Sequence, residues 1–407
     1  MTTARITEIH VEGMRTLADV RLKLDGLTVL IGENGTGKSS IIEACELCRR
    51  LASQDFMSEL YNPHGGAFAL LRDGASVLRL TITMQATFPG ESWIGLEYVV
   101  GLARERSGMV IQEEQLRVEY PDQPRPFLAI DRKQRWAKYF NGVHLVPFEG
   151  LAPDALALAS FGPAGPRHPS VSVVRDALQA IEVHLPFEVL PTWAARAHAR
   201  KSEIRGSVLL QPADRLDLLG TNLVNVYYAL REQSDRQYWS DTMDLLRLGL
   251  GIEFEEVRTV ADSGGGAHAL AIKWRGRDQP MTASALSDGQ IAFLAFVGMY
   301  RLPRPGRTLM AIDEPELHLH PGLLARVVQI FEAMGDHHPV LLSTHSDRVL
   351  DLLSDPVASV RVCELRRGAT HLRRLDRESL DTWLADFRGV GDLRSEGHLA
   401  DVMGGEA

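Results

Sequence analysis

Residues 27–39, Leu27-Thr-Val-Leu-Ile-Gly-Glu-Asn-Gly-Thr-Gly-Lys-Ser39, place a glycine-rich loop directly after a continuous apolar run. Such a run is typical of a strand that is buried on both faces. The residues that follow, from about Lys38 to Arg50, carry an apolar stripe at helical spacing and predict a helix. A strand, a glycine loop and a helix in this order form the first half of a βαβ unit, which predicts an α/β fold.

The glycine loop matches the pattern G-x-x-x-x-G-K-[ST] in full. Its glycines let successive backbone N–H groups point at phosphate oxygens, and the helix N-terminus adds a favourable dipole. Lys38 is expected to reach the β- and γ-phosphates of a nucleotide, and the Ser39 hydroxyl to ligate Mg²⁺. The alternative is a loop that only turns the chain. The nucleotide-binding candidates are Gly32, Glu33, Asn34, Gly35, Thr36, Gly37, Lys38, Ser39 and Ser40.

A second apolar run, Thr308-Leu-Met-Ala-Ile, ends in two acids, Asp313 and Glu314. Open α/β sheets bind ligands at the ends of their parallel strands, so these acids are expected beside the glycine loop. Asp313 is the predicted Mg²⁺ partner of Ser39, and Glu314 is predicted to orient and deprotonate an attacking water. Alternatively, the acids only cap the next element.

Two further segments offer polar groups at the ends of predicted elements. Leu286-Ser-Asp-Gly-Gln290 precedes an apolar helix, so its serine or aspartate could simply be an N-cap, although the loop also suits a phosphate. Val340-Leu-Leu-Ser-Thr-His345 reads as a buried strand that ends in a histidine. In a parallel sheet this histidine would lie near the same edge as Asp313 and could hydrogen-bond the γ-phosphate. A lone histidine at a strand end is, however, more often structural.

Composition excludes several classes of protein. The 407 residues are 45% hydrophobic and 24% charged, an ordinary globular balance that excludes a wholly disordered chain. No apolar run reaches about 18 residues and the N-terminus lacks the apolar core of a signal peptide, so a cytoplasmic protein without membrane contact is expected. The net charge of -9 does not favour nucleic acid, so any DNA contact needs a local basic patch. The three cysteines lack a framework spacing, which fits a reducing compartment.

Patterning along the rest of the chain predicts two lobes. Short alternating runs between about 75 and 148 predict an antiparallel sheet, and residues 152–170 are an irregular, proline-rich linker. Residues 171–250 are predicted to be largely helical, without the heptads of a long coiled coil, and residues 252–275 to form a hairpin.

The order of these motifs resembles that of the ABC-type P-loop ATPases of the SMC, RecF and OLD group. The order is glycine loop, Leu-Ser-Asp-Gly-Gln, Asp-Glu-Pro-Glu and Ser-Thr-His. Their stand-alone predicted-ATPase (AAA_21-like) branch is similar to this chain at residues 312–321 and 342–346. The resemblance covers roughly residues 1–50 and 280–350. It implies an ABC-ATPase head, with a mixed β-sheet lobe that carries the P-loop and a helical lobe. It also implies ATP and Mg²⁺ as cofactors, and hydrolysis of ATP to ADP and phosphate.

The resemblance also divides the chain into three parts. Residues 1–150 would be an N-terminal ATPase lobe with Walker A and the antiparallel sheet, residues 151–275 an inserted, mostly helical region with the hairpin, and residues 276–407 a C-terminal ATPase lobe with the signature, Walker B and the switch histidine. Only about 60 residues follow that histidine, so no nuclease domain is expected.

In that family two heads sandwich two ATP molecules, and the signature loop of one head contacts the γ-phosphate bound by the other. One copy of each motif therefore implies two chains, most simply a C2 homodimer, with Leu317–Pro321 in the loop that communicates across it. The implied catalytic residues are the P-loop lysine, the base and the switch histidine: Lys38, Glu314 and His345. The residues implied to act in trans are Ser287, Gly289 and Gln290.

Three positions fit the family pattern less closely. Asp288 replaces the glycine expected of transporter-like heads, a variant that suits the predicted-ATPase branch. Gln85 lies in about the right region for the glutamine loop. Arg15 resembles the family's N-terminal arginine near the nucleotide, and could equally be a solvated charge at a strand end.

Two functions remain open from the sequence. The first is an ATPase that dimerises on ATP in DNA repair, DNA maintenance or anti-phage defence. The second is a regulatory module whose ATP state holds a partner effector, such as a separately encoded nuclease or toxin. A transporter subunit is disfavoured by the large insertion. Two basic stretches, Arg132–Tyr139 and Arg196–Arg205, could contact DNA, although such runs are more often solvated surface.

Overall fold

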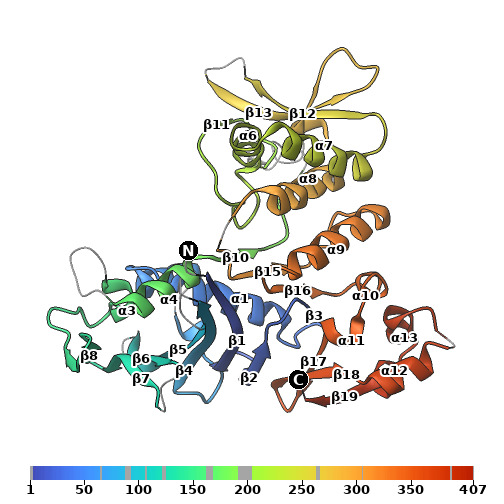
Figure 1. Cartoon of the computed structure of the whole chain (residues 1–407). Helices are drawn as coiled ribbons and strands as arrows, with labels where there is room; N and C mark the ends of the chain where they lie inside the picture. Colours follow the sequence, from blue (N-terminus) through green and yellow to red (C-terminus); the bar gives the residue numbers. More distant parts are fainter. Residues whose placement is uncertain are drawn as a thin grey trace.

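The computed structural model describes residues 3–64, 67–87, 93–105, 108–121, 125–161, 168–190, 204–262, 266–304, 306–385 and 387–406. The fold is α/β, as predicted, and is built on three sheets (Figure 1). One lobe holds a large sheet and a central sheet, and the other holds a small sheet with its covering helices.

The central sheet positions the P-loop. Its seven strands follow the order β10-β15-β16-β3-β17-β18-β19, and neighbouring strands from β10 to β17 run parallel whereas β18 and β19 pair antiparallel. The carboxyl ends of β15, β16 and β3 therefore meet at one edge. The strands are β10 (Ile181–His184), β15 (Leu309–Asp313), β16 (Val340–Thr344), β3 (Leu27–Gly32), β17 (Val360–Arg366), β18 (Ala369–Leu375) and β19 (Met403–Glu406).

Side chains of the central sheet alternate between two hydrophobic cores. Along β3, Leu30 packs into the core that contains α1 (Lys38–Arg50), and Val29 and Ile31 pack into the core on the other face. Successive side chains of a strand point to opposite faces of the sheet, and here both faces are covered by apolar residues. Burial on both faces explains why the sequence of β3 reads as an uninterrupted apolar run.

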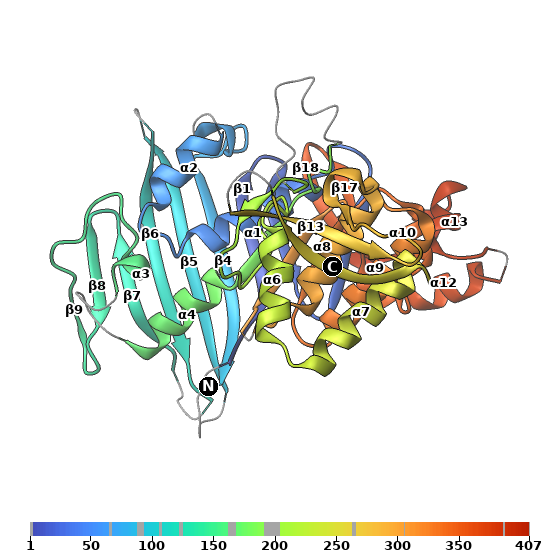
Figure 2. The same ribbon diagram turned by 90° about the horizontal axis from the view of Figure 1, so that it is seen from above.

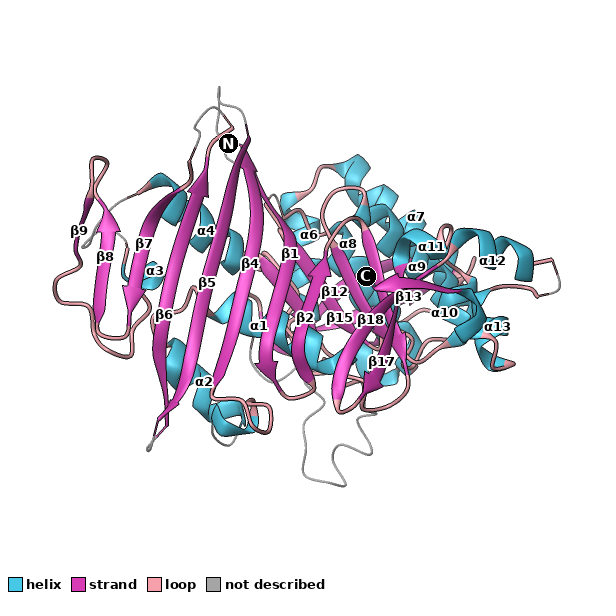
Figure 3. Cartoon of the chain, turned by 90° about the horizontal axis from the view of Figure 1, so that it is seen from below, coloured by secondary structure: helices cyan, strands magenta, loops and turns pink. Residues whose placement is uncertain are grey.

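The large sheet covers the outer side of α1. Its eight strands pair antiparallel throughout in the order β2-β1-β4-β5-β6-β7-β8-β9, as the alternating runs predicted (Figure 3). One face packs on α1 and α4 (Pro169–Gln179), and the other face is polar. The strands are β1 (Thr3–Met14), β2 (Leu17–Lys23), β4 (Val77–Thr87), β5 (Trp93–Glu105), β6 (Gly108–Glu119), β7 (Phe127–Lys133), β8 (Trp136–Phe140) and β9 (Leu145–Pro147).

The small sheet and the helices that it overlies form the helical lobe (Figures 1 and 2). Strands β12 (Phe254–Ala261) and β13 (Ala267–Trp274) make the predicted hairpin, and β11 (Val208–Leu209) and β14 (Met281–Thr282) pair with β13. Helix α8 (Asp288–Arg301) is buried along most of its length. It packs with α6 (Leu223–Gln233), α7 (Arg236–Leu250) and α9 (Pro321–Gly335) on the second face of the central sheet.

The prediction that residues 171–250 are largely helical holds for α4, α6 and α7, but it is wrong for residues 181–190 and 204–222, which contain strands β10 and β11 and irregular backbone. Ile181–His184 forms β10, an edge strand parallel to β15, and the polar side chains of Glu182 and His184 are buried in it. Helix α4 and strand β10 pack with α1 in one hydrophobic core. The division at residues 150 and 275 stays a prediction.

The remaining helices are short. They are α2 (Phe56–His64), α3 (Ala157–Ser160), α10 (Asp347–Asp351), α11 (Pro356–Ser359), α12 (Arg377–Trp383) and α13 (Val390–Ser395). In the described part of the chain the longest helices, α7 and α9, have 15 residues each, so that part contains no long coiled coil. Over the same residues, no helix combines the length and the apolar character needed to cross a membrane.

Candidate functional site

The glycine loop lies between β3 and α1, and its backbone requires glycine at two positions. Gly35 and Gly37 have φ values of 79° and 98°, in the left-handed region that glycine adopts readily. A Cβ atom on Gly37 would also lie 2.3 Å from the Thr370 hydroxyl oxygen. That hydroxyl donates a hydrogen bond to the carbonyl of Thr36 at 2.8 Å, so the C-terminal strand β18 supports the loop from behind. No sequence motif points to Thr370.

Lys38 folds over this loop. Its side chain is buried, and Nζ donates hydrogen bonds to the carbonyl oxygens of Gly32 at 2.9 Å and Glu33 at 3.0 Å. Burial lowers the pKa of Lys38, and the nearby charge of Arg394 lowers it further, whereas the charges of Glu314 and Asp313 raise it. The Lys38 ammonium group is therefore held at the loop, with a cationic and two anionic side chains nearby.

Ser39 and Asp313 come together from opposite parts of the chain. The Ser39 hydroxyl lies 3.4 Å from Oδ1 of Asp313, and the Ser343 hydroxyl of β16 also donates to that oxygen. The contact follows from topology, because Asp313 ends β15 and pairs in register with Ser343 of the adjacent parallel strand. A hydroxyl beside a carboxylate is an oxygen donor set suited to Mg²⁺.

Glu314 follows Asp313 with a left-handed backbone, at a φ of 46°. Non-glycine residues rarely adopt this region, and such strain is found at functional sites. Its N–H donates to the carbonyl of Ser343 at 2.9 Å, and its Oε1 lies 3.5 Å from Nε2 of His345. Glu314, the predicted base, and His345, the predicted switch histidine, therefore face one another.

Glu316, the second glutamate of Asp-Glu-Pro-Glu, ties this loop to β16. Its Oε1 accepts a hydrogen bond from the Thr344 hydroxyl at 2.6 Å and another from the backbone N–H of His345 at 3.0 Å. Glu316 was not singled out from the sequence, although its place in that motif is a signal that could have identified it.

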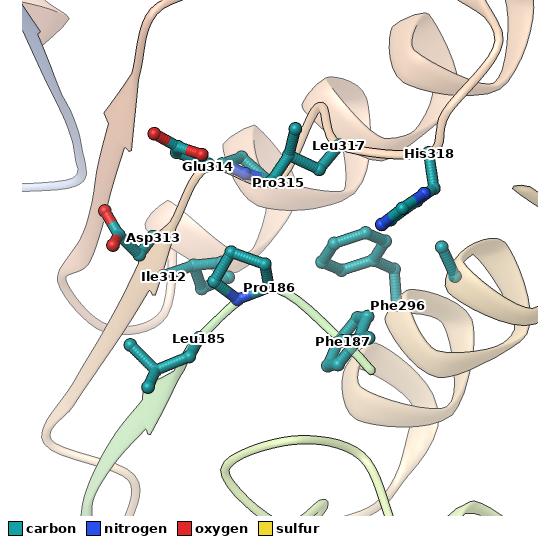
Figure 4. A pocket seen from close by; sticks show the side chains of 11 residues that line it. Leu185, Pro186, Phe187, Phe296, Ile312, Asp313, Glu314, Pro315, Leu317 and His318 are labelled. Atoms are coloured by element: carbon teal, nitrogen blue, oxygen red, sulfur yellow. The ribbon is translucent and has the colours of Figure 1, made fainter. Parts of the chain in front are cut away.

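Behind the two acids lies a small apolar pocket (Figure 4). In the figure the carboxylates of Asp313 and Glu314 point away from the rings of Phe187 and Phe296, whose centroids are 5.0 Å apart. Phe296 belongs to α8, so this pocket is where the Walker B end of β15 contacts the helix that follows the signature loop.

The signature loop forms a separate hollow. Ser287 is the N-cap of α8 and makes a full capping box with Gln290, so the plainer N-cap interpretation is confirmed. A Cβ atom on Gly289 would lie 2.9 Å from the carbonyl oxygen of His318. Among described residues, the lining of the hollow includes no P-loop residue: it comprises Arg205, Ser284, Ala285, Leu286, Ser287, Asp288, Gly289, His318, His320 and Leu323.

One arginine of each basic stretch is buried. Arg132 is 1% exposed and donates to the carbonyl of Pro153 at 2.6 Å, and Arg205 donates to the carbonyl of Leu286 and to Asp288 of the signature loop. These two side chains are therefore not available to DNA. Residues 196–203 of the second stretch lie outside the described residues.

The two remaining family-based candidates lie apart from each other. Arg15, with a φ of 46°, pairs with Glu43 of α1 at 2.6 Å, close to the loop. Gln85 pairs in register with Arg5, at the other end of the 12-residue strand β1. At the usual strand rise of about 3.3 Å per residue this separation is roughly 30 Å, so the structure gives no support to Gln85 as the glutamine loop.

Two family models match parts of the chain. A family model described as "AAA domain, putative AbiEii toxin, Type IV TA system" matches residues 104–351, and a model described as "AAA ATPase domain" matches residues 5–94. No curated protein matches the chain.

Three solved structures are similar over most of both chains. One is an Smc head bound to the C-terminal winged-helix domain of ScpA (15% identity, 93% of this chain and 99% of that chain, TM-score 0.49). Another is the SMC head domain from Thermotoga maritima (13%, 91% and 99%, 0.42). The third is an Smc head with an extended coiled coil, bound to the C-terminal domain of ScpA and derived from Pyrococcus furiosus (14%, 94% and 99%, 0.49).

The first family model covers more than half of the 407 residues and includes Asp313, Glu314 and His345. It agrees with the resemblance to ABC-type P-loop ATPases that the motifs gave, which is confirmed at the level of the family. The chain belongs to this family of AAA ATPase domains.

Proposed function

We propose that the chain is a Mg²⁺-dependent ATPase that dimerises when it binds ATP. The observation that supports this most directly is the convergence of five side chains at one edge of the central sheet: Lys38, Ser39, Asp313, Glu314 and His345. Phosphoryl transfer to water needs three parts that are found here. They are a phosphate loop with a lysine, a hydroxyl beside a carboxylate, and a second carboxylate that faces a histidine.

Each residue has a separate task in this proposal. Lys38 and the loop amides bind the β- and γ-phosphates, and Ser39 and Asp313 hold Mg²⁺. When bound, Mg²⁺ neutralises charge on the phosphate oxygens. Glu314 accepts the proton of the attacking water as general base, and His345 hydrogen-bonds the terminal phosphate group.

Dimerisation is supported by the position of the signature loop. Ser287 and Gly289 open onto a hollow whose lining shares no described residue with the P-loop of the same chain. A serine hydroxyl, a glycine amide and a helix N-terminus on that hollow suit a phosphate bound by a second copy. Two chains related by a two-fold axis would then each complete the other's site.

Steady-state hydrolysis of ATP by the purified protein, with Lys38→Ala as the blank, tests the activity. Turnover that requires Mg²⁺ and is lost in the blank supports the proposal, and a rate equal to the blank rejects it. Titration with duplex and single-stranded DNA then separates the two roles. Saturable stimulation supports a DNA-coupled role in repair, maintenance or defence.

An ATP-state module that holds a partner effector is the second candidate. It is favoured by the burial of Arg132 and Arg205, which removes two of the cations that a DNA-binding surface would use. It predicts a slow rate that is indifferent to DNA, and a protein partner whose binding depends on whether ATP is present.

A further inference from the structure

The last α-helix that the structure describes, α13, brings a cation to the proposed ATPase site that no motif assigns. Nη1 of Arg394 donates hydrogen bonds to the carbonyl oxygen of His345 at 3.3 Å and to Asp347 at 2.5 Å. Its Nη2 lies 3.5 Å from the carboxylate of Glu33 in the P-loop. The side chain is only 17% exposed. One guanidinium therefore spans the end of β16 and the P-loop.

Two glycines set the position of this helix. Figures 1 and 2 show α13 beside α10, the short helix that follows His345. The N–H of Gly391 donates to Asp351 of α10 at 2.8 Å, and a Cβ atom on Gly391 would lie 2.1 Å from the carbonyl oxygen of Asp347. A Cβ atom on Gly389 would lie 2.3 Å from Oδ1 of Asp351. This close approach lets the side chain of Arg394 reach β16.

His345 is held through both of its backbone polar groups. Its N–H donates to Glu316 and its carbonyl accepts from Arg394, while its ring faces Glu314. Hydrogen bonds to charged groups are stronger than neutral ones and fix geometry more firmly. The backbone of the switch residue is thus clamped between an acid from the loop after β15 and a base from the C-terminal helix.

We propose that Arg394 is a positioning residue that fixes His345 relative to Glu314 and the P-loop, which makes the C-terminal helix part of the ATPase site. The proposal rests on the ATPase function proposed above. Arg394 acts through His345, so its effect on turnover depends on the histidine ring being present.

A double-mutant cycle with Arg394→Met and His345→Ala tests this dependence. Arg394→Met keeps much of the aliphatic stem, and is expected to lower kcat roughly tenfold with KM within about twofold, the scale of losing hydrogen bonds to a charged group. In the His345→Ala background the same change is expected to lower kcat less than about twofold. An equal loss in both backgrounds, or a change confined to KM, overturns the proposal.

Arg377→Met is the matched control. Arg377 lies on α12 of the same C-terminal segment and pairs with Asp355 at 3.0 Å on the surface, so its loss is expected to leave kcat unchanged.

A second readout does not depend on turnover. Amide hydrogen exchange over residues 343–347 is expected to be faster in Arg394→Met than in Arg377→Met, because a clamp on that backbone is gone. Equal exchange in the two variants overturns the proposal even if the wild-type protein fails to hydrolyse ATP. A wild-type rate equal to that of Lys38→Ala rejects the ATPase function separately.

Discussion

Nε2 of His345 lies 3.5 Å from Oε1 of Glu314, although the two residues leave different strands of the central sheet. The relationship follows from strand register, because β15 and β16 are adjacent and parallel, with Asp313 opposite Ser343. It also depends on the left-handed backbone of Glu314, a conformation that costs about 1–3 kcal/mol and that the surrounding hydrogen bonds maintain. The strained backbone therefore belongs to Glu314, the residue that we propose as the general base.

Replacing Glu314 with Gln is expected to stop hydrolysis while ATP still binds. Loss of a general base typically costs about 100-fold or more in turnover, and the amide keeps the shape of the side chain. The variant is expected to accumulate as an ATP-bound dimer, seen by light scattering with size exclusion in Mg²⁺ and ATP. The surface carboxylate Glu97, paired with Arg117 at 3.0 Å, provides the control Glu97→Gln. A variant that stays monomeric in ATP at micromolar protein concentrations contradicts the proposed dimer.

Alanine at Gly37 is expected to cost more stability than alanine at Gly35. Both backbones are left-handed, which costs an alanine about 1–2 kcal/mol at either position. Only at Gly37 would the new Cβ also overlap the hydroxyls of Thr370 and Thr16, at 2.3 and 2.7 Å, for a further loss of about 1–3 kcal/mol. Thermal unfolding without nucleotide measures both variants. An equal decrease in Tm would mean that β18 does not support the loop.

The sequence predicted the P-loop unit well because its constraints are local. Helix α1 runs from Lys38 to Arg50, as predicted, since the motif fixes where the loop ends and the apolar stripe fixes the face that is buried. The large antiparallel sheet was likewise predicted from alternation along its strands, which one buried and one polar face enforce.

Other parts depend on contacts between distant residues and were not predictable in this way. Strand β10 carries the polar residues Glu182 and His184. Glu182 pairs with Arg304 and Arg307, which lie more than 100 residues later in the chain, so the local sequence does not show why this acid can be buried. Arg394 is 361 residues from Glu33, and no pattern links them. Local signals therefore identified the phosphate loop and the acids, whereas the residues that hold them in place became visible only in the fold.

The buried acid of β10 is expected to make the fold sensitive to acid. Burial alone would raise the pKa of Glu182, but the neighbouring ring of His184, 3.6 Å away, and the charges of Arg307 and Arg304 lower it to about 2. Its charged form therefore stabilises the fold fully above the unfolded pKa of 4.5, and this stabilisation is lost as pH falls from there towards about 2. The difference corresponds to about 3 kcal/mol.

Glu182→Gln is accordingly expected to lower the free energy of unfolding at pH 7 by about 3 kcal/mol, because two arginines stay buried without their partner. It should also flatten the pH dependence of stability between pH 4.5 and 2. Urea denaturation across this range measures both effects. Asp25→Asn, which breaks the exposed pair with Arg5, should cost less than about 1 kcal/mol. A Glu182→Gln profile parallel to that of the wild type would contradict the assignment.

Arg132→Met and Arg135→Met separate a structural arginine from a surface one in the same basic stretch. Arg132 lies 3.9 Å from Glu114, which is 0% exposed and also accepts hydrogen bonds from Tyr98 and from the backbone of Ala157 and Leu158. The loss of Arg132 removes the cation beside this buried acid and the hydrogen bond to the carbonyl of Pro153, and is expected to cost about 3–5 kcal/mol. Arg135 is exposed, and its replacement should change stability by less than about 0.5 kcal/mol. Urea denaturation measures this contrast, and equal stabilities would contradict the buried pair.

If this face binds DNA, Arg135→Met alone should weaken binding in a fluorescence anisotropy titration without loss of fold, because one phosphate contact is removed.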